Sequence, residues 1–418
     1  REFFAFRDIC EKRWDSPYKD WYKGVNFDWQ SPLGDPFGFE AWQGHFELPC
    51  LNLFNPAVRQ YLFDVILFWV NEFDIDGIRL DCANVLDFNF MKELRRETAA
   101  MKEDFWLMGE VIHGDYSRWV NPEMLHSVTN YELHKSIYSG FNDHNFFEIA
   151  HNVRRLEAIG RELYTFVDNH DTDRDNNRLA ANYIAANAYI MAMPGTPCVF
   201  LTHWKQYKTQ LKKLILARKA AGISNQSAIL KSEQHGNGYI VNVRGEKGNV
   251  LLALGTPDSY DVNGYKLAVE GDGYKYYVAD NVDISAVQAI ADEEPQTFTP
   301  PAFCTIDNDE RCAFFEAPSF WTGDVRCWQW DQTANYTGGS WPGTDCRYVG
   351  TTKDGNKVYK WSWNKQTKPV NNTDAGIIFN CDNGNKQTAN LEFVNGGYYD
   401  IYSGTKPKGI VTTSTGIK

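Results

Sequence analysis

Three short apolar segments, each ending in a carboxylate, constrain the fold more than any other feature of the chain. The first two end at Asp81 and Glu110, and the third is followed by Asp168-Asn169-His170-Asp171, which supplies the acid Asp171. Each segment has the length of a strand and follows a helical segment, and this alternation is typical of a parallel sheet with covering helices. In a parallel barrel, active sites form where the strands end. We therefore expect the three acids to converge on one mouth.

The segment at residues 75–81 places Arg79 two positions before Asp81. Side chains two apart in a strand share one face, so we expect the guanidinium to lie beside the carboxylate. Such a pairing holds a carboxylate in the ionised form that a nucleophile needs. A structural ion pair at a strand end is the alternative for this segment alone. The two further acids favour an active site.

The spacing of the first two acids suggests a reaction. The strands that end at Asp81 and Glu110 are consecutive, so we expect them to be neighbours about 4.8 Å apart. Carboxylates roughly 5–5.5 Å apart suit a retaining glycosidase. Asp81, paired with an arginine, is the predicted nucleophile. Glu110 follows Trp106 and Met108, and apolar surroundings favour the protonated carboxyl that a general acid needs.

The motifs around these acids resemble those of a known family. DGIRLD (76–81), GEV (109–111) and FVDNHD (166–171), in this order, resemble three signature regions of the α-amylase family, glycoside hydrolase family 13. LPCLN (48–52) resembles a fourth. The resemblance spans residues 1–255 and implies a barrel hydrolase that acts on α-glucans. It gives the first two acids the same roles that their spacing suggests.

The resemblance also implies roles for residues around the third acid. Asp171 resembles the family's third acid, which orients the sugar and stabilises the transition state. His170 would hydrogen-bond the same sugar, with a loop-capping role as the alternative, and Arg79 would belong to the substrate site.

Two departures from the family pattern affect subtype and metal content. The family's Asp-x-x-x-Asn-His signature is absent from this sequence, which weakens the case for the calcium site common in the family. We expect no required cofactor, and calcium is not supported by the residues present, so no metal ligand is predicted. Residues 82–85 resemble the Val-Ala-Asn-Glu of neopullulanase-like members, but Val85 stands in place of the glutamate. The subtype therefore stays open.

The amino-acid composition indicates which kinds of molecule the chain binds. The 54 acidic residues outnumber the 42 basic ones, for a formal charge of −12, which argues against nucleic acid or an anionic membrane. Aromatic residues make up 15% of the chain, and surplus Trp and Tyr suit sugar stacking. The nine cysteines are an odd number and are scattered, which indicates mostly free thiols. We expect a secreted or cell-surface protein of bacterial source.

The expected fold class is α/β. It consists of an incomplete (β/α)8 barrel that lacks its first strands, then an antiparallel β domain and a β-sandwich binding module. The predicted parts are a loop domain (1–56), a partial barrel (57–222), the antiparallel domain (223–292), a linker (293–302) and the sandwich (303–418). Within the barrel part, helices are expected at 55–71, 88–101, 146–159, 178–193 and 206–221, and two further strands at 126–131 and 197–201.

The last part of the chain carries a candidate carbohydrate platform. Trp328 and Trp330 alternate so that both face one side of a predicted strand, and Trp341 follows in a turn-rich segment. This trio resembles the platform of carbohydrate-binding module family 26, which implies stacking on glucose rings. The alternative is that the paired Trp side chains belong to the core of the sandwich.

The sequence is compatible with three functions. The first is a retaining hydrolase that cleaves inside starch. The second is an α-glucanotransferase or a cyclodextrin-degrading relative, and the third is an inactive starch-binding protein. The expected partners are starch and maltooligosaccharides.

The number of parallel strands also bears on assembly. Five strands instead of eight would leave two open sheet edges and uncovered apolar faces. We expect a homo-oligomer, a dimer or larger, to complete the barrel, with a separate shorter chain as the alternative.

Overall fold

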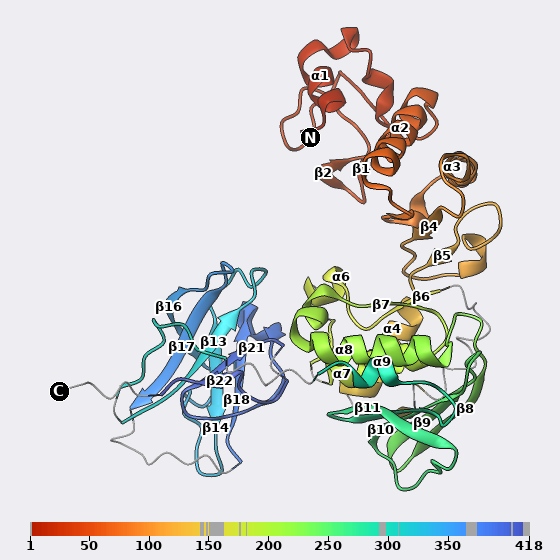
Figure 1. The fold of residues 1–418 in the computed structure, drawn as a ribbon. Coiled ribbons are helices and arrows are strands. Elements are labelled where there is room, and N and C mark those ends of the chain that lie inside the picture. Colours follow the sequence, from red (N-terminus) through yellow and green to blue (C-terminus); the bar gives the residue numbers. More distant parts are fainter. Residues whose placement is uncertain are drawn as a thin grey trace. The chain divides into compact units, whose positions relative to one another are not determined.

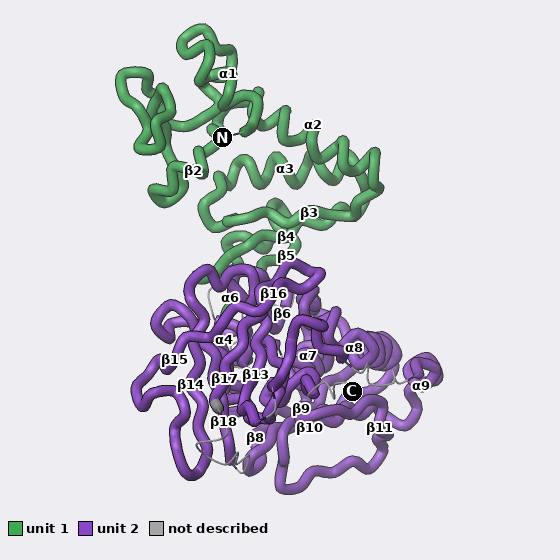
Figure 2. The backbone as a smooth tube through the Cα atoms, turned by 90° about the vertical axis from the view of Figure 1, so that its left-hand side faces the viewer, with its two compact units in different colours: residues 1–131 green, residues 132–418 purple. Residues whose placement is uncertain are grey.

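The computed structural model of the chain divides into two compact units, residues 1–131 and 132–418 (Figure 2). The structure describes residues 2–142, 146–147, 149, 163–174, 177–180, 182–291, 298–307, 309–364, 374–402 and 404–412. Most of the expected helix at 146–159, and the first half of the expected linker at 293–302, lie outside these ranges.

An aromatic cluster organises the start of the first unit. Helix α1 (Phe4–Lys12) and the hairpin of β1 (Ala41–Trp42) and β2 (His45–Pro49) surround buried rings that include Phe6 and Phe37. The sequence predicted an irregular loop domain and missed α1, because a nine-residue helix is too short for its periodicity to stand out. Two single turns of 3-10 helix follow it, η1 (Arg13–Asp15) and η2 (Lys19–Trp21).

Side-chain caps start the two long helices of the first unit, α2 (Pro56–Phe73) and α3 (Phe88–Met101). The Asn55 side chain accepts the N–H of Ala57 at 2.9 Å, and the Asp87 carboxylate accepts the N–H of Phe90 at 2.8 Å. Each cap satisfies a donor that the first turn leaves unpaired. Both helices were expected from the sequence, and α3 has the expected bounds.

The first unit also contains a three-stranded parallel sheet. Its strands have the order β3 (Gly77–Leu80), β4 (Trp106–Gly109) and β5 (Ser127–Val128). A Cβ on Gly77 would lie 2.3 Å from the carbonyl oxygen of Trp106, so glycine is what permits this close approach. Strand β5 is shorter than the strand expected at 126–131, because helix α4 already begins at Tyr131. The single turns η3 (Ala83–Val85) and η4 (Tyr116–Arg118) lie between the strands.

The second unit begins with further strands and helices. Strands β6 (Tyr164–Phe166) and β7 (Thr196–Cys198) form a parallel pair. Its helices include α4 (Tyr131–Asn142), α6 (His170–Arg174), α7 (Tyr183–Ala192) and α8 (Leu201–Ala221). Helix α8 starts at Leu201, so the strand expected at 197–201 is too long. As expected, α8 ends at Gly222, whose φ of 72° is left-handed.

An antiparallel sheet follows, and Figure 1 labels β8, β9, β10 and β11 in it. The strand order is β11-β12-β10-β9-β8. Its strands are β8 (Ile229–His235), β9 (Asn237–Val243), β10 (Val250–Thr256), β11 (Tyr265–Gly271) and β12 (Tyr274–Ala279), and the short helix α9 (Ser285–Gln288) comes after them. One face of this sheet shares a continuous apolar core with α7 and α8. Helix α7 is buried on every side, as its apolar sequence requires.

Two β-sheets make up the last part of the chain. The first has the order β16-β17-β13-β21-β22, and the second has the order β15-β14-β18-β19, with β20 also paired to β18. Their strands are β13 (Glu310–Ala317), β14 (Arg326–Trp330), β15 (Thr344–Asp345), β16 (Arg347–Thr351), β17 (Lys357–Asn364), β18 (Gly376–Cys381), β19 (Lys386–Gln387), β20 (Leu391–Glu392), β21 (Gly397–Asp400) and β22 (Gly409–Ile410), and η6 (Asp382–Gly384) is a single turn. Side chains from both sheets, including Phe315 and Phe379, form the core between them.

The alternation of parallel strands and helices, followed by β-rich parts, agrees with the expected fold class. Within the described residues, however, the five parallel strands form one three-stranded and one two-stranded sheet rather than one continuous sheet. All nine cysteines are free thiols, as expected. Among the described residues, no helix is long and apolar enough to span a bilayer.

Candidate active site

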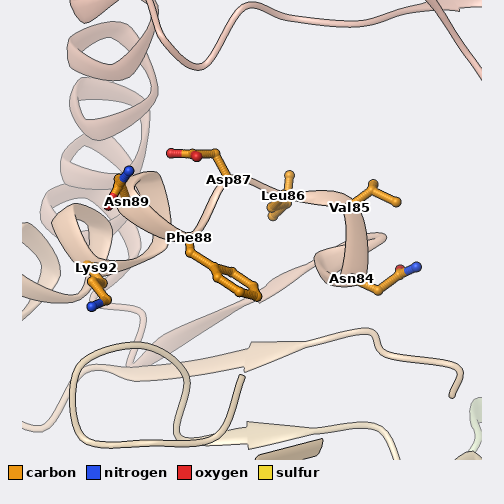
Figure 3. A pocket seen from close by; sticks show the side chains of 7 residues that line it. All are labelled: Asn84, Val85, Leu86, Asp87, Phe88, Asn89 and Lys92. Atoms are coloured by element: carbon orange, nitrogen blue, oxygen red, sulfur yellow. The ribbon is translucent and has the colours of Figure 1, made fainter. Parts of the chain in front are cut away.

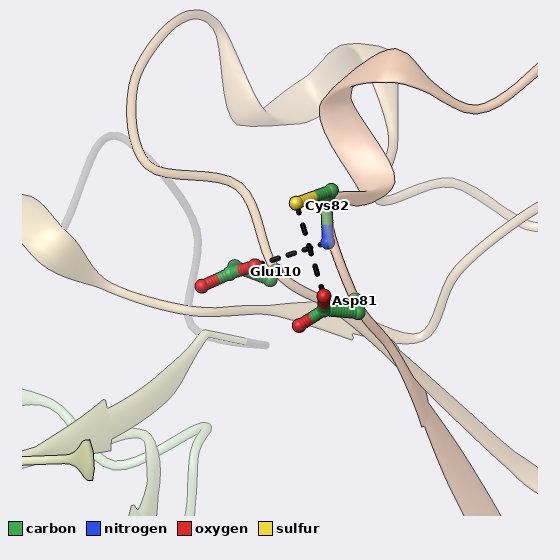
Figure 4. A group of neighbouring side chains, drawn as sticks. All are labelled: Asp81, Cys82 and Glu110. Atoms are coloured by element: carbon green, nitrogen blue, oxygen red, sulfur yellow. Dashed lines mark hydrogen bonds between the residues drawn. The ribbon is translucent and has the colours of Figure 1, made fainter. Parts of the chain in front are cut away.

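The register between β3 and β4 brings two predicted catalytic carboxylates together. Leu80 pairs with Gly109, so Asp81 and Glu110 directly follow paired positions on adjacent parallel strands. Oxygen atoms of the two carboxylates lie within 4.8 Å of each other, and Figure 4 shows both beside Cys82. The expected proximity is therefore present in the first unit.

Arg79 contacts both carboxylates. Its Nη1 donates to Oδ1 of Asp81 at 2.7 Å, as the strand periodicity predicted, and its Nη2 lies 3.2 Å from Oε1 of Glu110. The sequence did not predict the second contact. One guanidinium between two carboxylates offsets their mutual repulsion and fixes their spacing.

The two carboxylates differ sharply in environment. The Asp81 side chain is 74% exposed, whereas that of Glu110 is 6% exposed. Glu110 accepts the N–H of Cys82 at 3.0 Å and the O–H of Tyr131 at 3.3 Å. The sequence predicted apolar surroundings for Glu110 and did not predict these polar contacts with the buried carboxylate.

Sequence reasoning missed both of these donors. Tyr131 lies three residues past the end of β5, at the start of α4, and the sequence ended a predicted strand there without giving the hydroxyl group a role. Cys82 donates through its main chain and has a left-handed φ of 46°, which sequence does not reveal. Burial, with Asp81 and Glu110 nearby, raises the pKa of the Cys82 thiol to about 11. The thiol is therefore protonated near neutral pH and does not compete as a nucleophile.

The third predicted acid lies in the second unit. Asp171 is in the first turn of α6, where its Oδ1 lies 2.9 Å from Nη2 of Arg174 and its Oδ2 lies 3.4 Å from Nε2 of His170. Asn169, rather than His170, caps this turn, because its side chain accepts the N–H groups of Asp171 and Thr172. The His170 side chain is 65% exposed.

A polar pocket of about 570 Å³ begins three residues after Asp81. Its lining residues are Asn84, Val85, Leu86, Asp87, Phe88, Asn89 and Lys92 (Figure 3). Amide, carboxylate and ammonium groups here could hydrogen-bond hydroxyl groups, while Phe88 offers an apolar surface.

A group of possible metal ligands includes the two carboxylates. Among the described residues, Asp81, Cys82 and Glu110 form the group whose ligand atoms all lie within 4.8 Å. Calcium takes six to eight oxygen ligands, so a trio that includes a thiol and already holds an arginine does not fit it.

The predicted tryptophan platform lies on the second sheet of the C-terminal part. Along β14, buried Cys327 and Gln329 alternate with half-buried Trp328 and Trp330, so the two indoles face away from the inter-sheet core. Trp341 is 43% exposed and lies 6.1 Å from Trp328 between ring centroids. The alternative that the paired indoles belong to the core does not match this placement.

Two glycines lie directly beneath these indoles. A Cβ on Gly376 would lie 2.2 Å from the ring of Trp330, and a Cβ on Gly384 would lie 2.3 Å from Nε1 of Trp341. Larger residues would displace both rings.

Comparison with known families identifies two parts of the chain. Residues 1–206 match the family model of the alpha-amylase catalytic domain, and residues 313–393 match that of starch-binding module 26. Residues 1–206 are therefore assigned to the alpha-amylase family of glycoside hydrolases, and residues 313–393 to starch-binding module 26.

Curated relatives share this catalytic part. Over 205 residues the chain is 31% identical to the intracellular maltogenic amylase of Bacillus subtilis (strain 168), covering 47% of this chain and 34% of that one. It is 33% identical over 215 residues to the maltogenic alpha-amylase of Bacillus acidopullulyticus, covering 47% and 35%. With the cyclomaltodextrinase of Geobacillus thermopakistaniensis it shares 30% over 216 residues, covering 48% and 35%. The chain thus spans about a third of the length of these relatives.

Solved structures share the fold. The ligand-free cyclic alpha-maltosyl-(1→6)-maltose hydrolase from Arthrobacter globiformis matches with a TM-score of 0.55 and 18% identity, over 66% of this chain and 72% of that one. The debranching enzyme of Nostoc punctiforme matches with a TM-score of 0.52 and 18% identity, over 66% and 71%.

We predict that Arg79 is needed to hold the two carboxylates in place. Arg79→Met should lower kcat on a soluble maltooligosaccharide by about 100-fold, because preorganised charge at an active site contributes on this scale. Arg79→Lys should retain more activity than Arg79→Met, since one ammonium can still contact one carboxylate. Steady-state kinetics together with circular dichroism of both variants provide the measurement. Wild-type kcat in the Met variant would contradict the prediction.

Proposed function

We propose that this protein is a retaining, endo-acting hydrolase of α-1,4-glucosidic bonds in starch and related α-glucans. The observation that carries the proposal is the carboxylate pair at the ends of β3 and β4, held by one arginine. A separation in this range suits attack by one carboxylate and proton transfer by the other, without room for a water between them.

The proposed mechanism gives each carboxylate a distinct role. Asp81, the exposed member, attacks the anomeric carbon, and a covalent glycosyl-enzyme bond forms as the bond to the leaving oxygen breaks. Glu110 gives its proton to that oxygen. Glu110 then removes a proton from water, which attacks the anomeric carbon and releases Asp81. The reaction requires no cofactor.

Other residues bind the substrate in this proposal. Asp171 and His170 would hold sugar hydroxyls, as the family resemblance implies, and Arg79 would orient the nucleophile. The polar pocket that begins at Asn84 lies within a few residues of Asp81 along the chain and would hold a further part of the glucan.

The catalytic assignment predicts the effects of two nearly isosteric changes. Asp81→Asn and Glu110→Gln should each reduce hydrolysis of soluble starch at least about 1,000-fold, because each removes a group that forms or breaks a bond. Thermal unfolding and starch binding should change little. Asp76→Asn is the matched control. Asp76 directly precedes β3, at the end opposite to Asp81, and pairs with Lys102. Near wild-type kcat in either active-site variant would refute its assigned role.

A second candidate is favoured by the relatives. Several are named as maltogenic amylases and cyclomaltodextrinases, so short or cyclic maltodextrins are alternative substrates, and transfer between glucans is an alternative outcome. Product analysis separates these activities. Short maltooligosaccharides from soluble starch indicate an endo-hydrolase, and faster cleavage of cyclodextrin than of starch indicates the second candidate. Redistributed chain lengths indicate transfer, and unchanged substrate indicates a binding protein.

The tryptophan platform supports starch binding by the C-terminal module. Trp330→Ala and Trp341→Ala should each weaken adsorption to granular starch by about 1–3 kcal/mol, by analogy with aromatic stacking on bases. Cleavage of a short soluble substrate should be unchanged. Tyr348→Ala is the matched control, because Tyr348 is 53% exposed on the other sheet of the module. Equal loss of adsorption and cleavage would instead indicate a structural role for the indoles.

The apolar surface of α2 supports self-association. Phe68, Trp69 and Phe73 are 55%, 47% and 58% exposed, and β3 pairs only with β4 among the described residues. We propose that a second copy covers this surface, giving a homodimer or larger assembly. The assembly acts outside the cell or at its surface.

Native mass spectrometry during dilution tests this assembly. We expect oligomers for the wild-type chain and a shift toward monomer for Phe68→Ser combined with Trp69→Ser. Leu230→Ser, at a residue 43% exposed in the second unit, is the control. A wild-type chain that is soluble, active and monomeric at micromolar concentration would exclude self-association.

A further inference from the structure

The C-terminal module buries an arginine between its two sheets. Arg311, near the start of β13, is 1% exposed and is among the largest fully buried side chains. It points to the same side of β13 as Ala313 and Phe315, which belong to the inter-sheet core. Its guanidinium lies 4.7 Å from the ring centroid of Tyr336 and 4.3 Å from that of Phe393.

The polar contacts of Arg311 reach the strand that carries the platform. Its Nε donates to Oε1 of Gln329 at 3.2 Å, and its Nη2 lies 3.6 Å from Oδ2 of Asp331. Gln329 is the inward-facing residue between Trp328 and Trp330, and Asp331 directly follows Trp330. Arg311 therefore connects the first sheet to the two positions that flank Trp330.

Asp331 in turn organises the segment that leads to Trp341. Its Oδ1 accepts hydrogen bonds from the N–H and O–H of Thr333 and the N–H of Ala334, at 2.8, 2.7 and 3.0 Å. Its Oδ2 accepts the O–H of Tyr336 at 2.7 Å. The N–H of Tyr336 donates to the carbonyl of Gln329 at 3.0 Å, which folds the segment back along β14.

These hydrogen bonds also keep Asp331 charged. Desolvation acts to raise its pKa, but the bonds from Thr333 and Tyr336 and from the main chain outweigh it and lower the pKa of Asp331 to about 2. A charged pair is therefore retained in the interior at ordinary pH. Apolar residues of similar volume often stabilise a core as well as or better than a buried ion pair. Stability alone does not account for Arg311 and Asp331.

We propose that Arg311 and Asp331 are positioning residues, which fix Trp330 and the segment leading to Trp341 in the arrangement that binds glucan. The proposal rests on the proposed starch binding of this module. Glucan contacts the indoles, while the pair acts from the opposite face of β14. Without the Arg311–Asp331 pair, we expect the module to fold but the indoles of Trp330 and Trp341 to lose their fixed spacing.

Two variants and a matched control test the proposal in the full chain. Arg311→Met removes the cation, and Asp331→Asn keeps the shape of the side chain while removing its charge. Lys360→Met is the control, because Lys360 is another buried cation of the module. It is 4% exposed, pairs with Glu310 at 2.7 Å, and lies opposite Phe314 on the outer face of the first sheet.

Affinity for maltoheptaose is measured by calorimetry alongside thermal unfolding, with every chain also carrying Glu110→Gln so that the ligand is not hydrolysed. Arg311→Met and Asp331→Asn should raise Kd about tenfold, which corresponds to about 1.4 kcal/mol. Lys360→Met should leave Kd within about twofold even where its loss of stability matches that of Arg311→Met. Equal effects of Arg311→Met and Lys360→Met on Kd, or a wild-type Kd in Arg311→Met, would overturn the positioning role.

Hydrogen exchange of residues 331–341 separates this proposal from the proposed binding function. Arg311→Met should speed amide exchange in this segment relative to Lys360→Met, whether or not glucan binds. If the wild-type chain does not bind maltoheptaose but Arg311→Met still speeds exchange in this segment, starch binding is refuted and the anchoring of the segment is supported. Unchanged exchange in Arg311→Met would refute the anchoring itself.

Discussion

The parallel pairing of β3 with β4 is the constraint on which the candidate active site depends. Leu80 and Gly109 are paired, so the carboxylates of the residues that directly follow them, Asp81 and Glu110, lie close together. Arg79 contacts both carboxylates. A shift of one residue in either strand would send one carboxylate to the opposite face. Glycine at position 77 permits the close approach of the strands, so a residue without a side chain contributes to the spacing of two charged ones.

The C-terminal module uses the period-two geometry of a strand in a different way. The outward positions of β14 carry the indoles of Trp328 and Trp330, and the inward position between them carries Gln329, which accepts a hydrogen bond from Arg311. One strand therefore presents two indoles of the platform on one face and a contact with Arg311 on the other. The interior of the sandwich is therefore not uniformly apolar. Arg311 is buried between two aromatic rings, where its flat guanidinium can stack while its edge donates hydrogen bonds.

The two sites illustrate different uses of buried charge. At the active site, Arg79 contacts one exposed and one buried carboxylate, and the exposed one is available to substrate. In the module, both Arg311 and Asp331 are buried away from solvent and act through neighbouring residues. A charge that reacts needs access, whereas a buried charge needs an opposite charge and polar groups close to it.

The sequence alone determined the alternation of helices and strands, the carboxylates that directly follow β3 and β4, the Arg79–Asp81 pair and the fact that Trp328 and Trp330 share one side of their strand. These features follow from periodicity, which is local. Only the tertiary structure decided which groups surround Glu110, that Tyr131 and the main chain of Cys82 donate to it, and that Arg311 lies behind the platform. Each of these contacts joins residues distant along the chain. Local periodicity cannot specify them, because they depend on strand register and on how one sheet packs against another.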